Sequence, residues 1–253
     1  MPLDGDVTLI DVPTWLDLLT IVVAALGGAL FAARRGVTVT GVLLIAVAAG
    51  LGGGMIRDVL LDVGPPLAIS DRAYLPAAAV AAVCGMLLAR WSTHLAWPML
   101  LLDSLAIGLF AVVGVERTLA AGYPPASAVL IGVIAAIAGG IIRDLLAGDA
   151  PAILQEGPWD ASAALVGSVL MVVLVAGLDL PTRLVEWPII LVITTVAVLS
   201  VKLGWRAPMA HDLAPVLERP VAVVRRVARP ARAAGAPGEP GSTDQDQERD
   251  ERR

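Results

Sequence analysis

The chain has few charged or aromatic residues and almost no cysteine or histidine. Charged side chains make up 16% of its 253 residues, and there are one cysteine and two histidines. The single cysteine, Cys84, excludes a disulfide framework within one chain, and its apolar surroundings predict a small packing residue. His94 and His211 fall in a loop and in the C-terminal tail, so no metal cluster is expected.

The motifs that enzymes and nucleic-acid-binding proteins need are also missing. No nucleophile stands beside a base, which argues against an enzyme. We find no nucleotide-binding loop and no nucleic-acid-binding surface, so we expect no cofactor and no nucleic-acid partner.

What the chain has in abundance is apolar sequence. Hydrophobic residues make up 57% of it, and its mean hydropathy is +0.81. This composition is typical of membrane proteins. Seven apolar runs approach the ~20 residues that cross a bilayer as a helix. The predicted spans are residues 14–33, 40–61, 74–91, 98–120, 125–147, 161–178 and 187–204.

The distribution of charge around these spans predicts their orientation. Acidic residues precede the first span, where a signal peptide would carry positive charge, so we interpret that span as retained. Arg34, Arg35, Arg90 and most arginines of the tail fall on one side of a seven-span protein. The positive-inside rule then places the N-terminus outside and the C-terminus in the cytoplasm.

The sequence repeats itself after 86 residues (143 minus 57), with Arg57 falling on Arg143 and Asp58 on Asp144. In the same register and without a gap, the chain aligns Asp17 with Asp103, Gly28 with Gly114, Gly36 with Gly122, Gly53 with Gly139, Gly54 with Gly140 and Pro65 with Pro151. Biased apolar composition does not readily align Gly, Asp, Arg and Pro together, so we interpret the pattern as an internal repeat.

Each copy of the repeat holds three spans, so the second copy enters the membrane from the opposite side. The expected fold is an all-α polytopic membrane protein with two inverted three-helix repeats and one C-terminal helix, an architecture common in transport proteins. The expected parts are an extracellular N-terminus (1–13), a first repeat (14–91), a second, inverted repeat (98–178), a seventh helix (187–204) and a basic, then disordered cytoplasmic tail (205–253).

Glycine runs interrupt the second and fifth spans, and an Arg-Asp pair follows each run. The glycines are Gly52, Gly53 and Gly54 in one copy and Gly139 and Gly140 in the other. Glycines weaken a helix and charges in a membrane are costly, so both features need a reason. The glycines either allow a kink and expose the pore-lining backbone, or they serve close helix packing alone. Their duplication next to charges favours the functional interpretation.

The depth of the charges in the spans predicts two ion pairs. Each copy has an aspartate near the start of its first span and an arginine near the end of its second, at a similar depth. Neighbouring residues on a helix, such as Arg57 and Asp58, are not expected to face one another well. We therefore predict that Asp17 pairs with Arg57 and Asp103 with Arg143. Such pairs either gate a pore or only fix the helix register.

Three segments together resemble the prokaryotic branch of the trimeric intracellular cation (TRIC) channel family, also described as a glycine transporter family. They are LGGGMIRDVL at 51–60, DSLAIGLF at 103–110 and GGIIRDLLAG at 139–148. The resemblance implies a homotrimer in the cell membrane, with one pore per protomer conducting monovalent cations, chiefly potassium. It also implies kinks at Gly52, Gly53 and Gly54 and at Gly139 and Gly140, and it matches Arg57, Asp58, Arg143 and Asp144 to charged positions of the family.

The chain departs from the family in two respects, and two other functions stay open. Ala138 stands where a third glycine would stand, and Lys202 is the only lysine, so the lysine-dependent lipid binding of animal members is not assumed. Inverted repeats with glycine-broken helices also fit a secondary transporter for a small solute such as glycine. A membrane protein with a structural role alone is the third alternative.

The orientation is testable by cysteine labelling in a Cys84-free background. A cysteine at position 5 is expected to react with an impermeant reagent from outside intact cells. A cysteine at position 240 is expected to react only after the membrane is opened. The reverse pattern would overturn the orientation.

Overall fold

The computed structural model describes residues 13–91, 96–155 and 160–205, and these residues form helices joined by short connections. In chain order the elements are α1 (Thr14–Ala33), α2 (Val39–Leu61), α3 (Leu67–Ser70), α4 (Tyr74–Trp91), α5 (Ala96–Ala120), α6 (Pro125–Leu146), the 3-10 turn η1 (Ala152–Leu154), α7 (Asp160–Val172), the π-helical η2 (Val173–Gly177) and α8 (Thr182–Lys202). The expected N-terminal segment before residue 13 and the expected tail after residue 205 lie outside the described residues.

The helices agree with an all-helical protein that crosses a membrane several times. In the described part of the chain, six helices are long and apolar enough to span a bilayer, and Tyr74–Arg90 is apolar but shorter. At 1.5 Å per residue, the 18 residues of α4 extend about 27 Å, close to the ~30 Å of a hydrocarbon core.

Five helices begin and end within two residues of the expected spans, and so does α7 when it is taken together with η2, whereas α8 begins earlier. It starts at Thr182, directly after Pro181, instead of at residue 187. The expected span, 187–204, excluded Arg183 and Glu186. The structure places both in the first two turns of the helix and buries Glu186 to 4% exposure.

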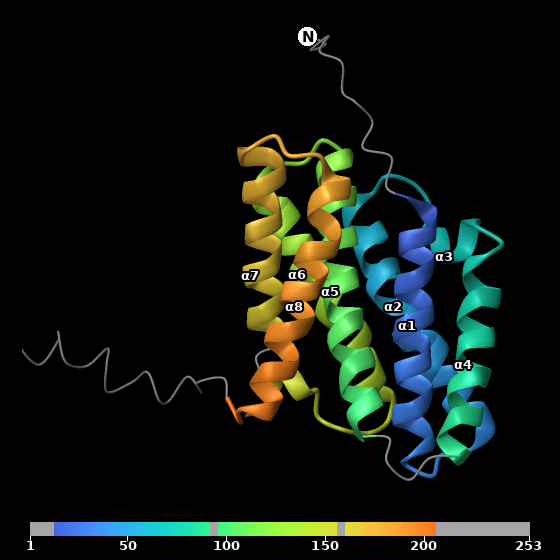
Figure 1. Ribbon diagram of the computed structural model, residues 1–253. Helices are drawn as coiled ribbons and strands as arrows, with labels where there is room; N and C mark the ends of the chain where they lie inside the picture. The colour runs from blue at the N-terminus through green and yellow to red at the C-terminus, as the bar shows by residue number, and fades with distance from the viewer. Residues whose placement is uncertain (1–12, 92–95, 156–159, 206–253) are drawn as a thin grey trace, which may run out of the picture. The chain divides into compact units, whose positions relative to one another are not determined.

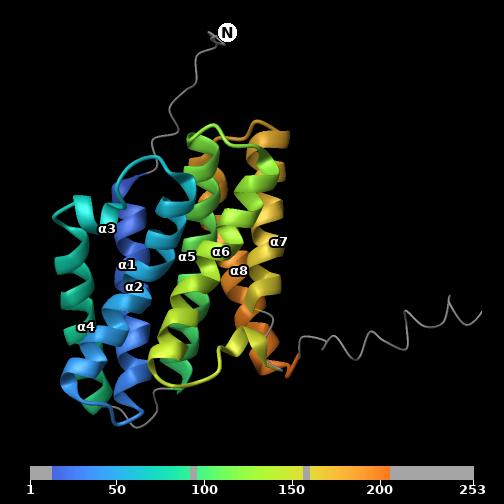
Figure 2. The same cartoon turned by 180° about the vertical axis from the view of Figure 1, so that it is seen from behind.

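Helix α5 packs against α1, α6, α7 and α8, and much of the apolar core lies around it. Figures 1 and 2 show α4 and α7 at opposite edges of the bundle, with α1, α2, α5 and α6 between them. α1 contacts α2, α4 and α5, and α2 contacts α6. The four central helices therefore bring the charged residues of both halves of the chain into one bundle.

Helices α2 and α6 cross at their glycines, with backbone against backbone. A Cβ added to Gly53 would lie 2.5 Å from the carbonyl oxygen of Ala135, and one added to Gly139 would lie 2.5 Å from that of Ala49. The later residue of α2 meets the earlier residue of α6, so the two helices run antiparallel. Only glycine allows this approach, because any side chain would collide with the facing carbonyl group.

Large apolar side chains are exposed along several helices. Leu44 of α2, Val80 of α4, Leu130 of α6 and Leu191 of α8 are all at least 60% exposed. Apolar surface on this scale is rare on soluble monomers and is expected where lipid or another protein covers the helix. The hydrophobic effect that would bury these side chains in water is absent in a bilayer.

The glycines of α6 provide a matched pair of variants. Gly139→Ala is expected to destabilise the purified protein by roughly 1–3 kcal/mol, because its Cβ would overlap the Ala49 carbonyl group. Gly140→Ala is expected to be neutral or stabilising by up to ~1 kcal/mol, because nothing lies within 4 Å of its added Cβ and alanine favours helix. Thermal unfolding in detergent measures both. Equal stability of the two variants would contradict the close crossing.

Candidate functional site

The first group of buried charges, which we call the Asp17 cluster, consists of Asp17, Arg57, Asp58, Tyr74 and Arg117. The Arg57 guanidinium donates to both oxygens of Asp17, at 3.1 and 3.2 Å. Arg117 lies 2.9 Å from Asp17 Oδ2, and the Tyr74 hydroxyl donates to the same oxygen at 3.0 Å. Asp17 and Arg57 are at most 1% exposed. Side chains from α1, α2, α4 and α5 therefore meet on one carboxylate.

The second group, the Asp103 cluster, consists of Phe31, Asp103, Arg143, Asp144 and Asp160. Arg143 Nη1 donates to Asp103 Oδ1 at 2.8 Å, and the guanidinium carbon of Arg143 lies 4.1 Å from the centre of the Phe31 ring. The side chains of Asp103 and Arg143 are 31% and 13% exposed. The structure thus brings together both aspartate–arginine pairs expected from the sequence, and it buries the second less deeply.

The expectation that adjacent arginine and aspartate would not face one another was wrong. Arg57 Nε donates to Asp58 Oδ1 at 2.8 Å, and Arg143 Nε donates to Asp144 Oδ1 at 3.1 Å. An arginine side chain is long enough to fold back along its helix and place Nε beside the next residue. Each guanidinium therefore bridges two carboxylates, which satisfies more of its donors than one pair would.

The second oxygen of each adjacent aspartate holds the segment after its helix. Asp58 Oδ2 accepts the backbone N–H of Leu67, and Asp144 Oδ2 accepts that of Ala152, both at 3.0 Å. Asp58 and Asp144 therefore tie the connections after α2 and α6 to the arginines. Each of these aspartates is bonded through one oxygen to the arginine and through the other to a backbone N–H. This arrangement suits a structural role in holding the arginine.

Four members of the clusters were not identified from the sequence, because the two copies differ there. In the 86-residue register Tyr74 falls on Asp160, and Phe31 falls on Arg117. A search for identical residues in the two copies cannot find such positions. The signal that was present is the charge of Arg117 within an apolar span, which is costly and needs a partner.

These differences give the clusters different charge. The Asp17 cluster has two carboxylates and two guanidinium groups. The Asp103 cluster has three carboxylates and one guanidinium group, since Asp160 replaces a tyrosine and Phe31 replaces an arginine. Arg35 also stacks on Phe31 but is paired with Asp149. The Asp103 cluster is therefore the more attractive of the two to a cation.

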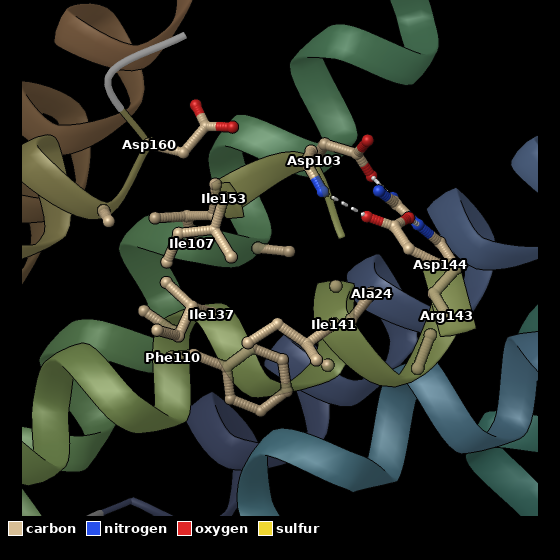
Figure 3. Close-up of a pocket in the computed structure, with 17 residues that line it drawn as sticks. Ala24, Asp103, Ile107, Phe110, Ile137, Ile141, Arg143, Asp144, Ile153 and Asp160 are labelled. Carbon is tan, nitrogen blue, oxygen red and sulfur yellow. Dashed lines mark hydrogen bonds and ion pairs between the residues drawn. The ribbon is translucent and has the colours of Figure 1, made fainter. Parts of the chain in front are cut away.

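Each cluster borders a cavity. One cavity of about 100 Å³ is lined by Asp103, Arg143, Asp144 and Asp160 and by apolar side chains that include Phe110. Figure 3 shows Asp160 across this cavity from Asp103 and Asp144, with isoleucines between them. The other cavity, of about 530 Å³, is lined by polar groups that include Asp58, Tyr74 and Arg117.

The five glycines of the two motifs lie in three kinds of position. Gly52, Gly53 and Gly139 are at the α2–α6 crossing, where an added Cβ would come within 2.5 Å of an atom of the facing helix. Gly54 would bring a Cβ to 3.7 Å from the Arg57 guanidinium, and Gly140 faces open space. Gly139 and Gly140 also line the Asp103 cavity. α2 and α6 continue as α-helix through these residues.

A match to a known sequence family defines the class of this protein. A family described as "Glycine transporter" matches residues 14–90 and again residues 100–176, together more than half of the chain. The second match begins 86 residues after the first (100 minus 14), which is the spacing of the repeat. The chain belongs to this family, and within it to the TRIC proteins, as the following relatives indicate.

The curated relatives are membrane proteins, and the solved structures are channels. The chain is 36% identical to the "UPF0126 inner membrane protein YadS" of Escherichia coli over 157 residues, which cover 62% of this chain and 75% of the relative. It is 35% identical to a "UPF0126 membrane protein" of Deinococcus radiodurans over 159 residues, which cover 61% of this chain and 72% of the relative.

The fold is similar to that of bacterial TRIC channels. A TRIC orthologue from Rhodobacter sphaeroides superposes with a TM-score of 0.70 and 31% identity, covering 76% of this chain and 97% of the orthologue. A second TRIC cation channel superposes with a TM-score of 0.69 and 28% identity, covering 78% and 97%. The protein is therefore a polytopic membrane protein of a channel family, not an enzyme.

A double-mutant cycle tests the energetic weight of the first pair. Asp17→Asn and Arg57→Gln are each expected to cost about 3–5 kcal/mol, because each leaves a buried charge with too few partners. The double variant is expected to be more stable than additivity predicts, by roughly 1–3 kcal/mol. Thermal unfolding in detergent provides the stabilities.

Two further cycles calibrate this result. Asp103→Asn with Arg143→Gln is expected to give a smaller coupling, because that pair is more exposed. Arg35→Gln with Asp149→Asn, whose side chains are 38% and 40% exposed, is expected to give less than ~1 kcal/mol. Strict additivity in the Asp17 and Arg57 cycle would show that the pair carries no stability.

Proposed function

We propose that the protein is a homotrimeric channel for monovalent cations, chiefly potassium, with one pore in each protomer between the Asp17 and Asp103 clusters. The observation that carries this proposal is the pair of charged clusters, each with its own cavity, on the two sides of the α2–α6 glycine crossing. The fold shared with TRIC cation channels supports the same function.

We further propose that residues 14–91 and 98–178 are inverted repeats, with α8 as an addition. Each contact between the halves has a counterpart in which both residues are replaced by the equivalent residues of the other half, 86 positions away. This correspondence supports the arrangement. Gly53 approaches Ala135 as Gly139 approaches Ala49. Within the halves, Gly28 approaches Ala46 and Gly114 approaches Gly132, again 86 residues apart. A two-fold axis through the crossing of α2 and α6 generates such pairs of contacts.

The distance between the two clusters along the helix axes is compatible with a pore that crosses the membrane between them. The crossing is centred near residue 51 of α2 and residue 137 of α6, so Arg57 and Arg143 each lie six residues beyond it in opposite directions. At 1.5 Å per residue the arginines are roughly 18 Å apart along the axes. This separation fits within the ~30 Å hydrocarbon core, with one cluster toward each surface.

The closed crossing between the cavities represents a non-conducting state in this proposal. A cation is first drawn to the Asp103 cluster, whose carboxylates outnumber its guanidinium groups three to one. Release of each aspartate from its arginine would then leave a carboxylate free to attract the ion. The glycines, which present backbone instead of side chains, let the path pass between α2 and α6 when these helices separate.

The cell membrane is the proposed location, with the N-terminus outside and the C-terminus in the cytoplasm. The inner-membrane name of the Escherichia coli relative supports this location. The exposed apolar faces of the helices offer surface for lipid and for two further copies of the chain. A permeant potassium ion and bound lipid, with no other cofactor, complete the proposal.

Transport of glycine is the second candidate, because one cavity fits a zwitterion. The Asp103 cavity presents carboxylates and the Arg143 guanidinium within the same small space, so it has partners for an ammonium and a carboxylate group. The family description also names glycine. A non-transporting structural protein is the third candidate, in which the glycines serve packing alone.

Flux into proteoliposomes distinguishes these functions. We expect potassium to enter faster than sodium, down its gradient and without saturation in the millimolar range. Gly140→Val is expected to lower the flux strongly while the protein stays folded, because Gly140 lines the Asp103 cavity and nothing lies within 4 Å of its added Cβ. Ala126→Val, on the exposed first turn of the same helix, is the control for added volume.

Other outcomes select the alternatives. Saturable glycine uptake driven by an ion gradient would replace the channel with a transporter. If neither cation nor glycine moves through trimeric, folded protein, the structural role stands. Unchanged flux in Gly140→Val would place the path away from the Asp103 cavity.

A further inference from the structure

A third group of buried acids lies between α5 and α8, apart from both predicted pairs. Glu116 of α5 is 1% exposed and Glu186 of α8 is 4% exposed. α5 and α8 pack antiparallel, with Gly108 of α5 against Ile190 and Thr194 of α8. In this register Glu116, eight residues after Gly108, lies level with Glu186, eight residues before Thr194, and the two carboxyl groups interact.

Among the described residues, the ionised carboxylate of Glu116 has no hydrogen-bond donor at either oxygen. Two ionised carboxylates cannot satisfy each other, because neither has a proton to donate. An unpaired carboxylate buried among apolar helices is costly. A single proton held between the two groups would supply the missing donor and remove one of the two charges.

The charged groups around this pair are few. Arg117 on the same helix acts on Glu116, and Arg183 acts on Glu186. Asp17 of α1 and Tyr74 of α4 lie on the side of Arg117 and do not face the two glutamates. In the described parts of α6 and α7, no charged side chain is found acting on either carboxyl group.

Within the described part of the chain, the Arg117 guanidinium contacts Asp17 and still has one hydrogen-bond donor without an acceptor. One of its terminal nitrogens lies 2.9 Å from Asp17 Oδ2, while its buried Nε has no acceptor among the described residues. Glu116, whose carboxylate oxygens have no donor in the part of the chain that the structure describes, directly precedes Arg117 in α5. Arg117 therefore bonds one carboxylate, Asp17, and acts electrostatically on a second, Glu116, whose oxygens it does not bond.

We propose that Glu116 and Glu186 form a proton-binding site, and that loss of its proton draws Arg117 from Asp17 toward Glu116 and loosens the Asp17 cluster. In this step the O–H bond of the shared carboxylic acid breaks, its electron pair stays on oxygen, and the proton passes to water. The site then carries two negative charges next to Arg117. The inference rests on the proposed channel, in which the Asp17 cluster closes one end of the path.

A proton fits this site better than a metal ion does. No group of three or more acidic, histidine or cysteine side chains in the described residues is placed to hold a metal, and Glu116 and Glu186 are only two. Potassium also needs several oxygen ligands and room for them, whereas a proton needs two oxygen atoms in contact. The direction of the pH dependence follows: at low pH the site keeps its proton and Arg117 stays on Asp17, and at high pH the proton is lost and Arg117 is released.

The test measures potassium flux into proteoliposomes at mildly acidic and mildly alkaline pH, set equal on both sides. Wild-type flux is expected to rise with pH. Glu116→Gln cannot lose a proton, so its flux is expected to stay at the acidic level throughout. Glu186→Gln removes the like charge facing Glu116 and offers it an amide donor, so the rise is expected at a lower pH. Asp179→Asn, an exposed loop variant, should keep the wild-type profile.

Infrared spectroscopy of the purified protein gives a readout independent of flux. The difference between the spectra of wild-type protein and Glu116→Gln is expected to contain the carbonyl band of a protonated carboxylic acid at acidic pH, and this band is expected to fade as pH rises. A pH profile in Glu116→Gln equal to that of wild type would overturn the proposal. So would a band that responds to potassium at constant pH, since the site would then bind a metal cation.

The proposed function can fail separately. If the infrared band titrates while no cation crosses at any pH, the channel function is wrong and the proton site controls no cation path. If cations cross at a rate that pH does not change, the channel stands and the coupling through Arg117 is wrong.

Discussion

The close contact between the backbones of α2 and α6 is the constraint on which the rest of the structure depends. Because Gly53 and Gly139 have no side chain, each lets a carbonyl group of the facing helix approach to a distance that a Cβ would prevent. The antiparallel crossing fixes where the next turns of both helices lie. Arg57 and Arg143, each four residues after its glycine, are carried to opposite sides of the contact. Their positions make two separate clusters.

Burial of these arginines in an apolar bundle determines much of what surrounds them. A guanidinium at membrane depth needs acceptors, since lipid supplies none. Each arginine obtains them from the following residue of its own helix and from the first helix of its own half. The adjacent aspartate then binds the backbone of the next connection, so that one cluster orders a helix end, a loop and a neighbouring helix.

The sequence was sufficient to predict what the two halves of the chain share. Apolar runs identified the helices, and the repeat singled out Asp17 with Asp103 and Arg57 with Arg143 because these residues are the same in both copies. It was not sufficient where the copies differ, at Tyr74 and Asp160 or at Phe31 and Arg117. Those residues can be identified only from the fold, which brings α4 and α5 to the Asp17 cluster and α1 and α7 to the Asp103 cluster.

A second limit of the sequence-based prediction concerns the start of the last helix and the burial of Glu186. Glu186 precedes residue 187, where the sequence predicts that the seventh span begins. The helix begins before it, and packing against α5 buries it beside Glu116. Periodicity along one helix cannot predict this burial, because it depends on the register between two helices that are distant in the sequence.

The unequal construction of the clusters implies that the two ends of the bundle resist opening unequally. Asp17 is held by residues of α2, α4 and α5, so its release requires several helices to shift together. Among the described residues, the ion-pair partner of Asp103 is Arg143 alone, and the contact of Arg143 with α1 is to the face of Phe31. Cation–π contacts restrain position less than a bidentate ion pair does. If α2 and α6 separate at their crossing, the Asp103 end gives way first, and the link from α5 to Asp17 through Arg117 sets the resistance of the other end.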